Sequence, residues 1–225
     1  MKIEKFKKMA NGRYQLTLDN GEQLQLYEEV ILKYELLLKK EIQKDKMISI
    51  EEYNTEWDVY YTALKSLKSR FKSSYELRKS LLDKAYPGEL VDKAINKLTE
   101  QKYLDDRSFT KGYINNQIIT SSKGPNRIMK DLSSKGIMNS IIQEEILVFN
   151  EDIQKEKIDK IIRISIKSNR NRGGVVLKNK IINDLINNGY SYDVITKVIS
   201  NYEFDNDSII AKREYDKLYK RLSRK

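Results

Sequence analysis

Residues 128–146 read IMKDLSSKGIMNSIIQEEI, and the apolar spacing of this stretch occurs twice more in the chain. It recurs in residues 77–95 (LRKSLLDKAYPGELVDKAI) and in residues 181–199 (IINDLINNGYSYDVITKVI). The copies lie roughly fifty residues apart, which is typical of a repeat array. The shared positions are Leu77, Leu81, Ala85, Tyr86, Val91 and Ile95, then Ile128, Leu132, Gly136, Ile137, Ile142 and Ile146, then Ile181, Leu185, Gly189, Tyr190, Ile195 and Ile199.

Each copy predicts two helices joined by a sharp turn. Two apolar residues four positions apart, such as Ile128 and Leu132, lie on one face of a helix. Gly136 then ends that helix, because glycine adopts the left-handed conformation without steric cost. With the helix that precedes it, each copy forms a three-helix repeat. One repeat cannot bury its apolar stripe alone, so we predict a mainly α protein whose tandem repeats stack into an elongated, curved array.

The N-terminal segment differs from the repeats and predicts a small antiparallel β-sheet. Asn11-Gly12 and Asn20-Gly21 are typical of hairpin turns. Alternating apolar residues around them indicate strands at about 2–9, 13–18 and 23–27. We expect a helix over roughly 28–45 to cover this sheet. The side chains expected to face inward from that helix are Val30, Ile31, Tyr34, Leu37 and Leu38.

Local signals mark where several helices begin. Ser49 with Glu52, and Ser73 with Glu76, have the spacing of capping boxes. Pro125 follows Gly124 and fits the first position of a helix. The chain is thus predicted to have five parts. They are 1–48 (sheet plus helix), 49–103, 104–150 and 151–204 (three-helix repeats), and 205–225 (a basic helix).

Composition narrows the class of protein. The 225 residues include 43 Lys and Arg against 33 Asp and Glu, a net charge of +10, which favours an anionic partner. A bias toward Lys, Ile and Asn, as an AT-rich genome imposes, would produce the same charge. The absence of Cys excludes disulfides and thiolate metal sites. No stretch is long and apolar enough to span a bilayer, so we expect a soluble, cytoplasmic protein.

The residue types offer little for catalysis. The chain has neither His nor Cys, which removes the usual general base near neutral pH and the strongest nucleophile. The carboxylate pairs Asp105-Asp106, Glu144-Glu145 and Glu51-Glu52 fit helix starts and helix surfaces. No phosphate-binding loop or metal-ligand spacing is present. We expect no enzyme, cofactor or metal; a metal-dependent nuclease using Asp105 and Asp106 is the enzymatic alternative.

Basic residues recur near the turn between the first and second helix of each repeat. Solvated helix faces are the alternative explanation for Lys and Arg, but stacking would align these clusters into a stripe that follows a phosphate backbone. The candidates are Arg70, Lys72, Arg78 and Lys79, then Lys123, Arg127, Lys130 and Lys135, then Lys167, Arg170, Arg172, Lys178 and Lys180.

The tail from Asp207 predicts a last basic helix. Ala211, Tyr215, Leu218 and Leu222 share one side of it. Such a helix can lie on an anionic membrane, but its apolar face is narrow. Docking onto the last repeat or contact with nucleic acid is therefore favoured, and no membrane partner is expected.

Three segments resemble the central motif of the bacterial RecX regulators. They are residues 103–109 (YLDDRSF), 123–128 (KGPNRI) and 135–137 (KGI), and the likeness extends over about residues 46–202. The family usually has Gly where Ala85 and Lys102 stand. It often has Arg where Asn115 and Gln117 stand, so those two positions are not counted as phosphate contacts.

The resemblance implies a regulator of the RecA recombinase in recombinational DNA repair. Such a protein binds the RecA filament on single-stranded DNA and restrains its ATPase and strand exchange. A helical array with a basic stripe would suit that task without hydrolysing anything. The alternative is a general DNA-binding protein, on single- or double-stranded DNA, that acts without RecA. A linear array needs no symmetric partner, so we expect a monomer.

Overall fold

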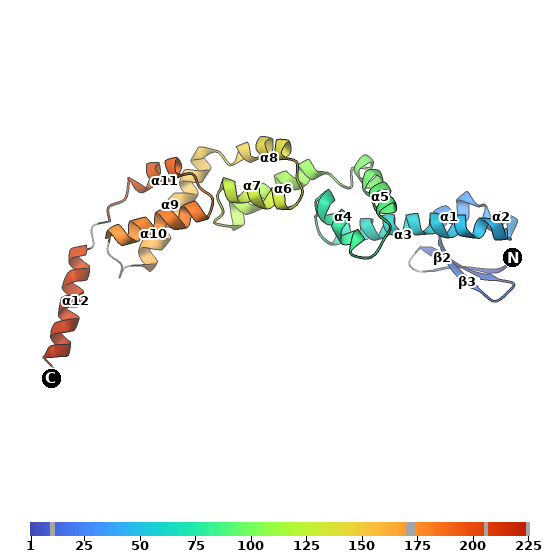
Figure 1. Cartoon of the computed structure of the whole chain (residues 1–225), viewed down its shortest axis with the longest axis horizontal. Helices are drawn as coiled ribbons and strands as arrows, with labels where there is room; N and C mark the ends of the chain where they lie inside the picture. The colour runs from blue at the N-terminus through green and yellow to red at the C-terminus, as the bar shows by residue number, and fades with distance from the viewer. Residues whose placement is uncertain (10–11, 170–173, 205–206, 224–225) are drawn as a thin grey trace. The chain divides into compact units, whose positions relative to one another are not determined.

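The computed structural model describes the backbone of residues 1–9, 12–169, 174–204 and 207–223. It divides into two compact units, Met1–Asp106 and Arg107–Lys225. We call them the N-terminal unit and the C-terminal unit and describe each by itself (Figure 1). The five-part domain division predicted above stays a prediction.

The N-terminal unit begins with the predicted three-stranded antiparallel sheet. Its strands are β1 (Ile3–Lys8), β2 (Arg13–Leu18) and β3 (Gln23–Tyr27), in the order β1-β2-β3. Leu16 pairs with a residue on each side, Phe6 in β1 and Leu24 in β3. Leu16 and Leu18 are both fully buried, so the alternation in β2 points one face of the sheet at the core.

The single helix predicted over 28–45 is wrong. The chain forms α1 (Glu28–Lys33), α2 (Leu36–Lys39) and a 3₁₀ turn η1 (Lys44–Lys46), with a break at Glu35, whose φ is +55°. Leu36 is buried in place of Leu37 and Leu38, which are 43% and 82% exposed. The helix cannot continue because the chain returns to the sheet. There the Ile3 amide donates to the Lys40 carbonyl oxygen at 2.9 Å.

One of the two predicted capping boxes is also wrong. The long helix α3 (Met47–Ser69) begins two residues before Ser49, and its N-cap, Lys46, makes no side-chain cap. Met47 and Ile50 pack into the cluster beneath the sheet, which favours the earlier start. The box at Ser73 is confirmed. The Glu76 amide donates to Ser73 Oγ at 3.1 Å, and the Ser73 amide donates to Glu76 Oε2 at 3.3 Å.

The predicted three-helix repeats are present. They are α3, α4 (Ser74–Leu82) and α5 (Gly88–Glu100); α6 (Asp106–Thr120), α7 (Pro125–Ser134) and α8 (Asn139–Glu145), followed by the 3₁₀ turn η2 (Ile146–Val148); and α9 (Glu151–Ser168), α10 (Gly174–Asn187) and α11 (Tyr192–Ile199). Ala85, Gly136 and Gly189 all take positive φ, at 62°, 75° and 94°. The shared spacing therefore marks the same turn three times. Lys102, where the resemblance expects Gly, also has a φ of +63°.

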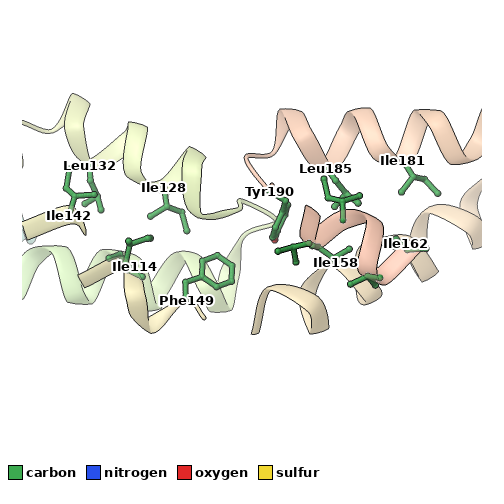
Figure 2. Packing of buried hydrophobic residues seen from close by; sticks show 14 of the residues in the cluster. Ile114, Ile128, Leu132, Ile142, Phe149, Ile158, Ile162, Ile181, Leu185 and Tyr190 are labelled. Atoms are coloured by element: carbon green, nitrogen blue, oxygen red, sulfur yellow. The ribbon is translucent and has the colours of Figure 1, made fainter. Parts of the chain in front are cut away.

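The second and third repeats share one core in the C-terminal unit. Ile128 and Leu132 of repeat two belong to the same buried cluster as Ile181 and Leu185 of repeat three (Figure 2). Tyr190 lies between the two groups of side chains in Figure 2. These two repeats therefore stack, as the amphipathic pattern requires.

The predicted tail helix forms as α12 (Asp207–Leu222). Tyr215, Leu218 and Leu222 are between 56% and 70% exposed, so docking of their face onto the third repeat is not observed. Across the described residues, no helix combines the length and the apolar character that crossing a membrane requires.

Candidate nucleic-acid interface

The predicted basic residues that the structure describes form one group in each repeat, on and beside its second helix, and we call these groups the three cationic corners. Their members extend from the first-to-second helix turn to the last turn of the second helix (Lys79) and its C-cap (Lys135). In the first corner, Arg70 and Lys72 precede α4, and Arg78 and Lys79 lie on it. Lys72 is held in place by two hydroxyls: its Nζ donates to Ser66 Oγ at 2.8 Å and to Ser80 Oγ at 3.3 Å.

Two cations of the first corner, Arg78 and Arg70, form ion pairs with carboxylates. Arg78 donates from Nε and Nη2 to the carboxylate of Asp92 on α5, at 2.7 and 3.2 Å. This hydrogen bonding lowers the pKa of Asp92 and raises the pKa of Arg78. Arg70 lies 3.7 Å from Glu76 Oε1. Among the residues that the structure describes, Lys79 has no partner and is exposed, so it is the cation of this corner that is available to a phosphate.

In the second corner, the carboxylate of Asp131 contacts several donor groups. Asp131 Oδ2 accepts from Lys123 Nζ at 2.6 Å and from the Tyr113 hydroxyl at 3.2 Å, and Arg127 Nε lies 3.9 Å from Oδ1. Lys135 Nζ lies 5.6 Å from the centre of the Tyr113 ring. Lys123 and Arg127 thus share one carboxylate, and with Lys130 and Lys135 the corner keeps a positive charge. Lys130 is exposed and, in the described chain, unpaired.

The Gly-Pro motif is a joint between repeats two and three. The Gly124 amide donates to the Asn188 carbonyl oxygen at 2.7 Å, and the Asn126 amide donates to that of Gly189 at 3.1 Å. A free helix start would offer such amides to an anion. Here the α10–α11 turn covers the start of α7, so a phosphate would have to bind through the side chains of the corner.

The third corner lies on α9 and α10. Lys167 is in the last turn of α9, Lys178 and Lys180 are on α10, and Lys180 pairs with Asp184 one turn further along. Lys167 and Lys178 are exposed and have no partner within the described ranges. The remaining two candidates, Arg170 and Arg172, lie outside the described residues.

The structure thus separates the candidates into paired and unpaired cations. Arg127 with Asp131, and Lys180 with Asp184, have the i,i+4 spacing that predicts helical ion pairs, so the sequence carried this signal. The Gly124–Gly189 joint links the second corner to the third repeat. A single stripe through all three corners stays a prediction.

Asp106 and the pair Glu144-Glu145 make contacts within the protein. Asp106 caps α4: its Oδ1 accepts from the Ser74 amide at 2.8 Å, and its Oδ2 accepts from the Ser74 hydroxyl. Arg107 lies 2.7 Å from both Glu144 and Glu145. In the described part of the chain, no three His, Cys, Asp or Glu side chains gather as metal ligands. This geometry gives the nuclease alternative no support.

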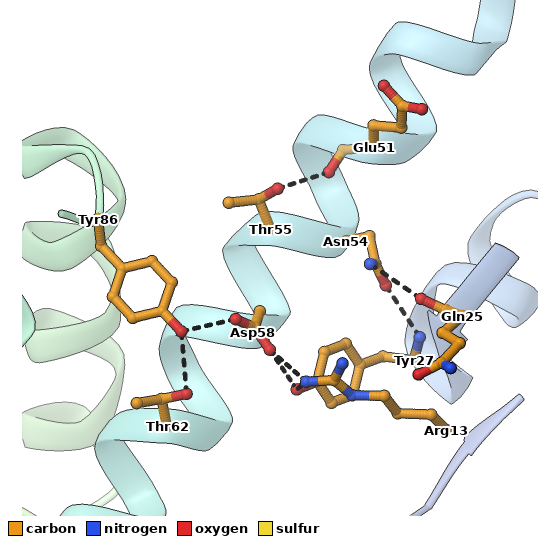
Figure 3. A network of polar contacts seen from close by, with 9 residues as sticks. All are labelled: Arg13, Gln25, Tyr27, Glu51, Asn54, Thr55, Asp58, Thr62 and Tyr86. Carbon is orange, nitrogen blue, oxygen red and sulfur yellow. Dashed lines mark hydrogen bonds and ion pairs between the residues drawn. The ribbon is translucent and has the colours of Figure 1, made fainter. Parts of the chain in front are cut away.

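A polar network around Asp58 had no sequence signal (Figure 3). Asp58 on α3 accepts from the Tyr27 hydroxyl at 2.8 Å and from the Tyr86 hydroxyl at 2.6 Å, and it pairs with Arg13. Burial favours a higher pKa for Asp58, but the tyrosine hydrogen bonds and the charge of Arg13 hold its pKa below the usual value. Burial, aided by Asp58, raises the pKa of Tyr27 to about 12. The network ties the sheet to the first repeat.

Comparison with known proteins identifies relatives that share this sequence and fold. The family model described as "RecX, first three-helix domain" matches residues 60–98. Regulatory protein RecX of Listeria innocua is 30% identical over 182 residues, which cover 81% of this chain and 68% of that protein. The chain belongs to the RecX family.

Other RecX proteins match over most of their length. Regulatory protein RecX of Streptococcus sanguinis is 26% identical over 229 residues, covering 100% of this chain and 86% of the relative. A crystal structure of regulatory protein RecX superposes with a TM-score of 0.75 at 26% identity, over 90% of this chain and 100% of that one. RecX from Lactobacillus salivarius gives a TM-score of 0.63 at 25% identity, over 66% of this chain and 97% of that one.

Proposed function

We propose that this protein binds the RecA–single-stranded DNA filament and restrains its ATPase and strand exchange, acting as a monomer in the cytoplasm. The observation that carries the proposal is a RecX fold in which every three-helix repeat has a cationic corner on and beside its second helix. The family supplies RecA as the protein partner. The corners supply the contact with the DNA in the filament.

The unpaired lysines suit a phosphate backbone better than base recognition. Lys79, Lys130 and Lys178 are exposed point charges, one in each corner, on the second helix of their repeats. Each contact with single-stranded DNA releases a counterion, so binding through them depends on salt and is indifferent to sequence. A regulator of a filament that forms on any sequence needs that kind of contact.

The role proposed here is binding without catalysis. Asp106 is bound by Ser74, and Glu144 and Glu145 by Arg107, so these carboxylates act in the fold. The regulator would alter RecA by occupying its filament. Its effect on the ATPase should therefore saturate with the amount bound.

The direct test is the ATPase rate of RecA on circular single-stranded DNA, titrated with this protein. We expect the rate to fall and then level off. The variant K79E/K130E/K178E should need at least tenfold more protein for the same effect, because each change reverses an unpaired charge. The matched control K5E/K44E/K65E reverses three exposed lysines outside the corners and should act like the wild type.

An unchanged ATPase rate at saturating protein would refute the proposal. If the protein then still binds bare oligonucleotides, the alternative of a general DNA-binding protein takes its place. Binding to a labelled oligonucleotide, measured by fluorescence anisotropy at several salt concentrations, distinguishes these two outcomes.

A further inference from the structure

A groove in the C-terminal unit, between the end of α6 and one face of α9, has no part in the cationic corners. It consists of two adjoining hollows of about 230 and 660 Å³. Both hollows are lined by Ile118, Lys157, Lys160 and Ile164.

The walls of the groove are aliphatic and exposed. Ile119 at the end of α6 is 82% exposed, and Ile164 on α9 is 58% exposed. Between them, Ile118 and Ile161 are half-buried and pack on the core. Exposed apolar side chains continuous with a core are typical of surfaces that bind another protein.

The floor of the groove carries positive charge. Lys157 is half-buried, and its Nζ donates to the carbonyl oxygens of Gln117 at 3.4 Å, of Ser121 at 2.8 Å and of Ile118, at the carboxyl end of α6. Lys160 is exposed and has no partner among the described residues. Burial, and next the charge of Lys160, lower the pKa of Lys157. Two ammonium groups thus face one groove.

Among the residues that the structure describes, no carboxylate pairs with either lysine. The described lining of the smaller hollow contains none. In the larger hollow, Asp159 forms an ion pair with Arg163 and accepts a hydrogen bond from the Tyr202 hydroxyl. Glu156, also in the larger hollow, is exposed and makes no ion pair with either lysine in the described structure. A carboxylate from outside would complete the site.

We propose that this groove binds an apolar segment of a protein partner that carries an Asp or Glu side chain. The carboxylate pairs with Lys160 above the smaller hollow, while aliphatic side chains of the segment cover Ile119 and Ile164. The inference rests on the proposed function, in which the protein partner is the RecA of the filament. In this proposal the groove contacts protein, whereas the cationic corners contact DNA.

Two other occupants fit less well. A nucleic acid would pair with Lys160, but its backbone would leave the isoleucine walls exposed to water. The apolar face of α12 would cover them, but α12 carries five Lys and Arg side chains against three Asp and Glu, and this net positive charge would be repelled by the lysine pair. Leu218 and Leu222 on that face are exposed in the structure, so α12 does not cover the groove there. An acidic and apolar protein segment satisfies both features of the groove.

The test measures binding to RecA–single-stranded DNA filaments and to the bare oligonucleotide in parallel. The variants are Ile164→Asp, which places a charge in the apolar wall, and Lys160→Met, which keeps the length of the side chain and removes its charge. The control is Leu147→Asp, because Leu147 in η2 is 74% exposed and does not line the groove. Far-UV circular dichroism checks that each variant folds.

We expect both groove variants to bind the filament at least tenfold more weakly than Leu147→Asp does, with oligonucleotide affinities within about twofold of that control. Filament binding equal to the control would overturn the assignment of the groove and leave the proposed function intact. A wild-type protein that binds no filament at all would overturn the proposed function and this partner with it. A groove variant that loses filament and oligonucleotide binding equally would assign the groove to DNA and also overturn the inference.

Discussion

Gly189 in repeat three packs directly on Arg127 in repeat two: a Cβ atom at Gly189 would lie 2.4 Å from the Arg127 backbone nitrogen. The same glycine has a φ of +94°, which an L side chain rarely adopts. Its lack of a side chain therefore serves two purposes. It ends α10, and it lets two repeats approach through their backbones.

Gly189→Ala should lower the free energy of unfolding of the C-terminal unit by about 2–4 kcal/mol, because it combines a steric clash with left-handed strain. Gly21→Ala is the matched control: Gly21 has a φ of +83°, but nothing lies within 4 Å of its would-be Cβ. The control should lose only about 1 kcal/mol. Urea unfolding followed by circular dichroism measures both. Equal losses of unfolding free energy in the two variants would contradict the close approach of Gly189 to the Arg127 backbone.

Ala85→Gly and Lys102→Gly should each stabilise the N-terminal unit by about 1 kcal/mol, because both residues hold positive φ without being glycine. Lys93→Gly, at an exposed position inside α5, should instead lose about 1 kcal/mol. Urea unfolding followed by the fluorescence of Trp57, the one tryptophan in the chain, measures the N-terminal unit. Destabilisation by both glycines would show that these turns are not left-handed.

Ser73→Ala should cost about 1 kcal/mol, because it removes the hydroxyl that accepts the Glu76 amide at the start of α4. Ser49→Ala should cost nothing and can gain a few tenths of a kcal/mol, since Ser49 lies inside α3. Thermal unfolding of the two variants compares the loss of stability at Ser73, where the capping box forms, with that at Ser49, where the sequence predicts a box that the structure lacks. Equal losses would mean that Ser49 also caps a helix.

Local patterns predicted the repeats, and tertiary contacts account for what they missed. Four-spaced apolar pairs such as Leu77 and Leu81 are both buried as expected, because helical spacing alone decides which face meets the core. The break at Glu35 has no such signal. Pairing of Lys40 with Ile3 at the sheet edge forces it, and those residues are far apart in the sequence.

That the basic clusters form a binding site stays a prediction, and the sequence indicated only some of the ion pairs within them. Lys180 and Asp184 are four residues apart, so their ion pair follows from helix geometry. Arg78 and Asp92 lie on different helices, and only the packing of α4 against α5 brings them together. Which cations stay available to an anion is therefore a tertiary property.

Asp58→Asn should lower the free energy of unfolding at pH 7 by about 1–3 kcal/mol, because it removes a charged acceptor from two tyrosines and a partner from Arg13. Folding lowers the pKa of Asp58, so its stabilisation is present above the unfolded pKa of about 3.9 and is lost as the pH falls through the lower folded pKa. The stability gap between wild type and variant should therefore narrow from pH 7 to pH 3. A constant gap would contradict the network.

Lys130→Ala should reduce the salt dependence of binding to single-stranded DNA by about 0.7 in the slope of log K against log salt, the value for one lost phosphate contact. Lys180→Ala should reduce it by less, because Lys180 already pairs with Asp184. Fluorescence anisotropy of a labelled oligonucleotide across a salt series gives both slopes. Equal changes would show that the intramolecular pair does not compete with phosphate.

Co-sedimentation with RecA–single-stranded DNA filaments tests the central claim most directly. The account predicts that the wild-type protein pellets with the filament and saturates it, while the K79E/K130E/K178E variant stays mostly in the supernatant at the same concentration. A wild-type protein that remains in the supernatant with filaments at saturating RecA would contradict the account.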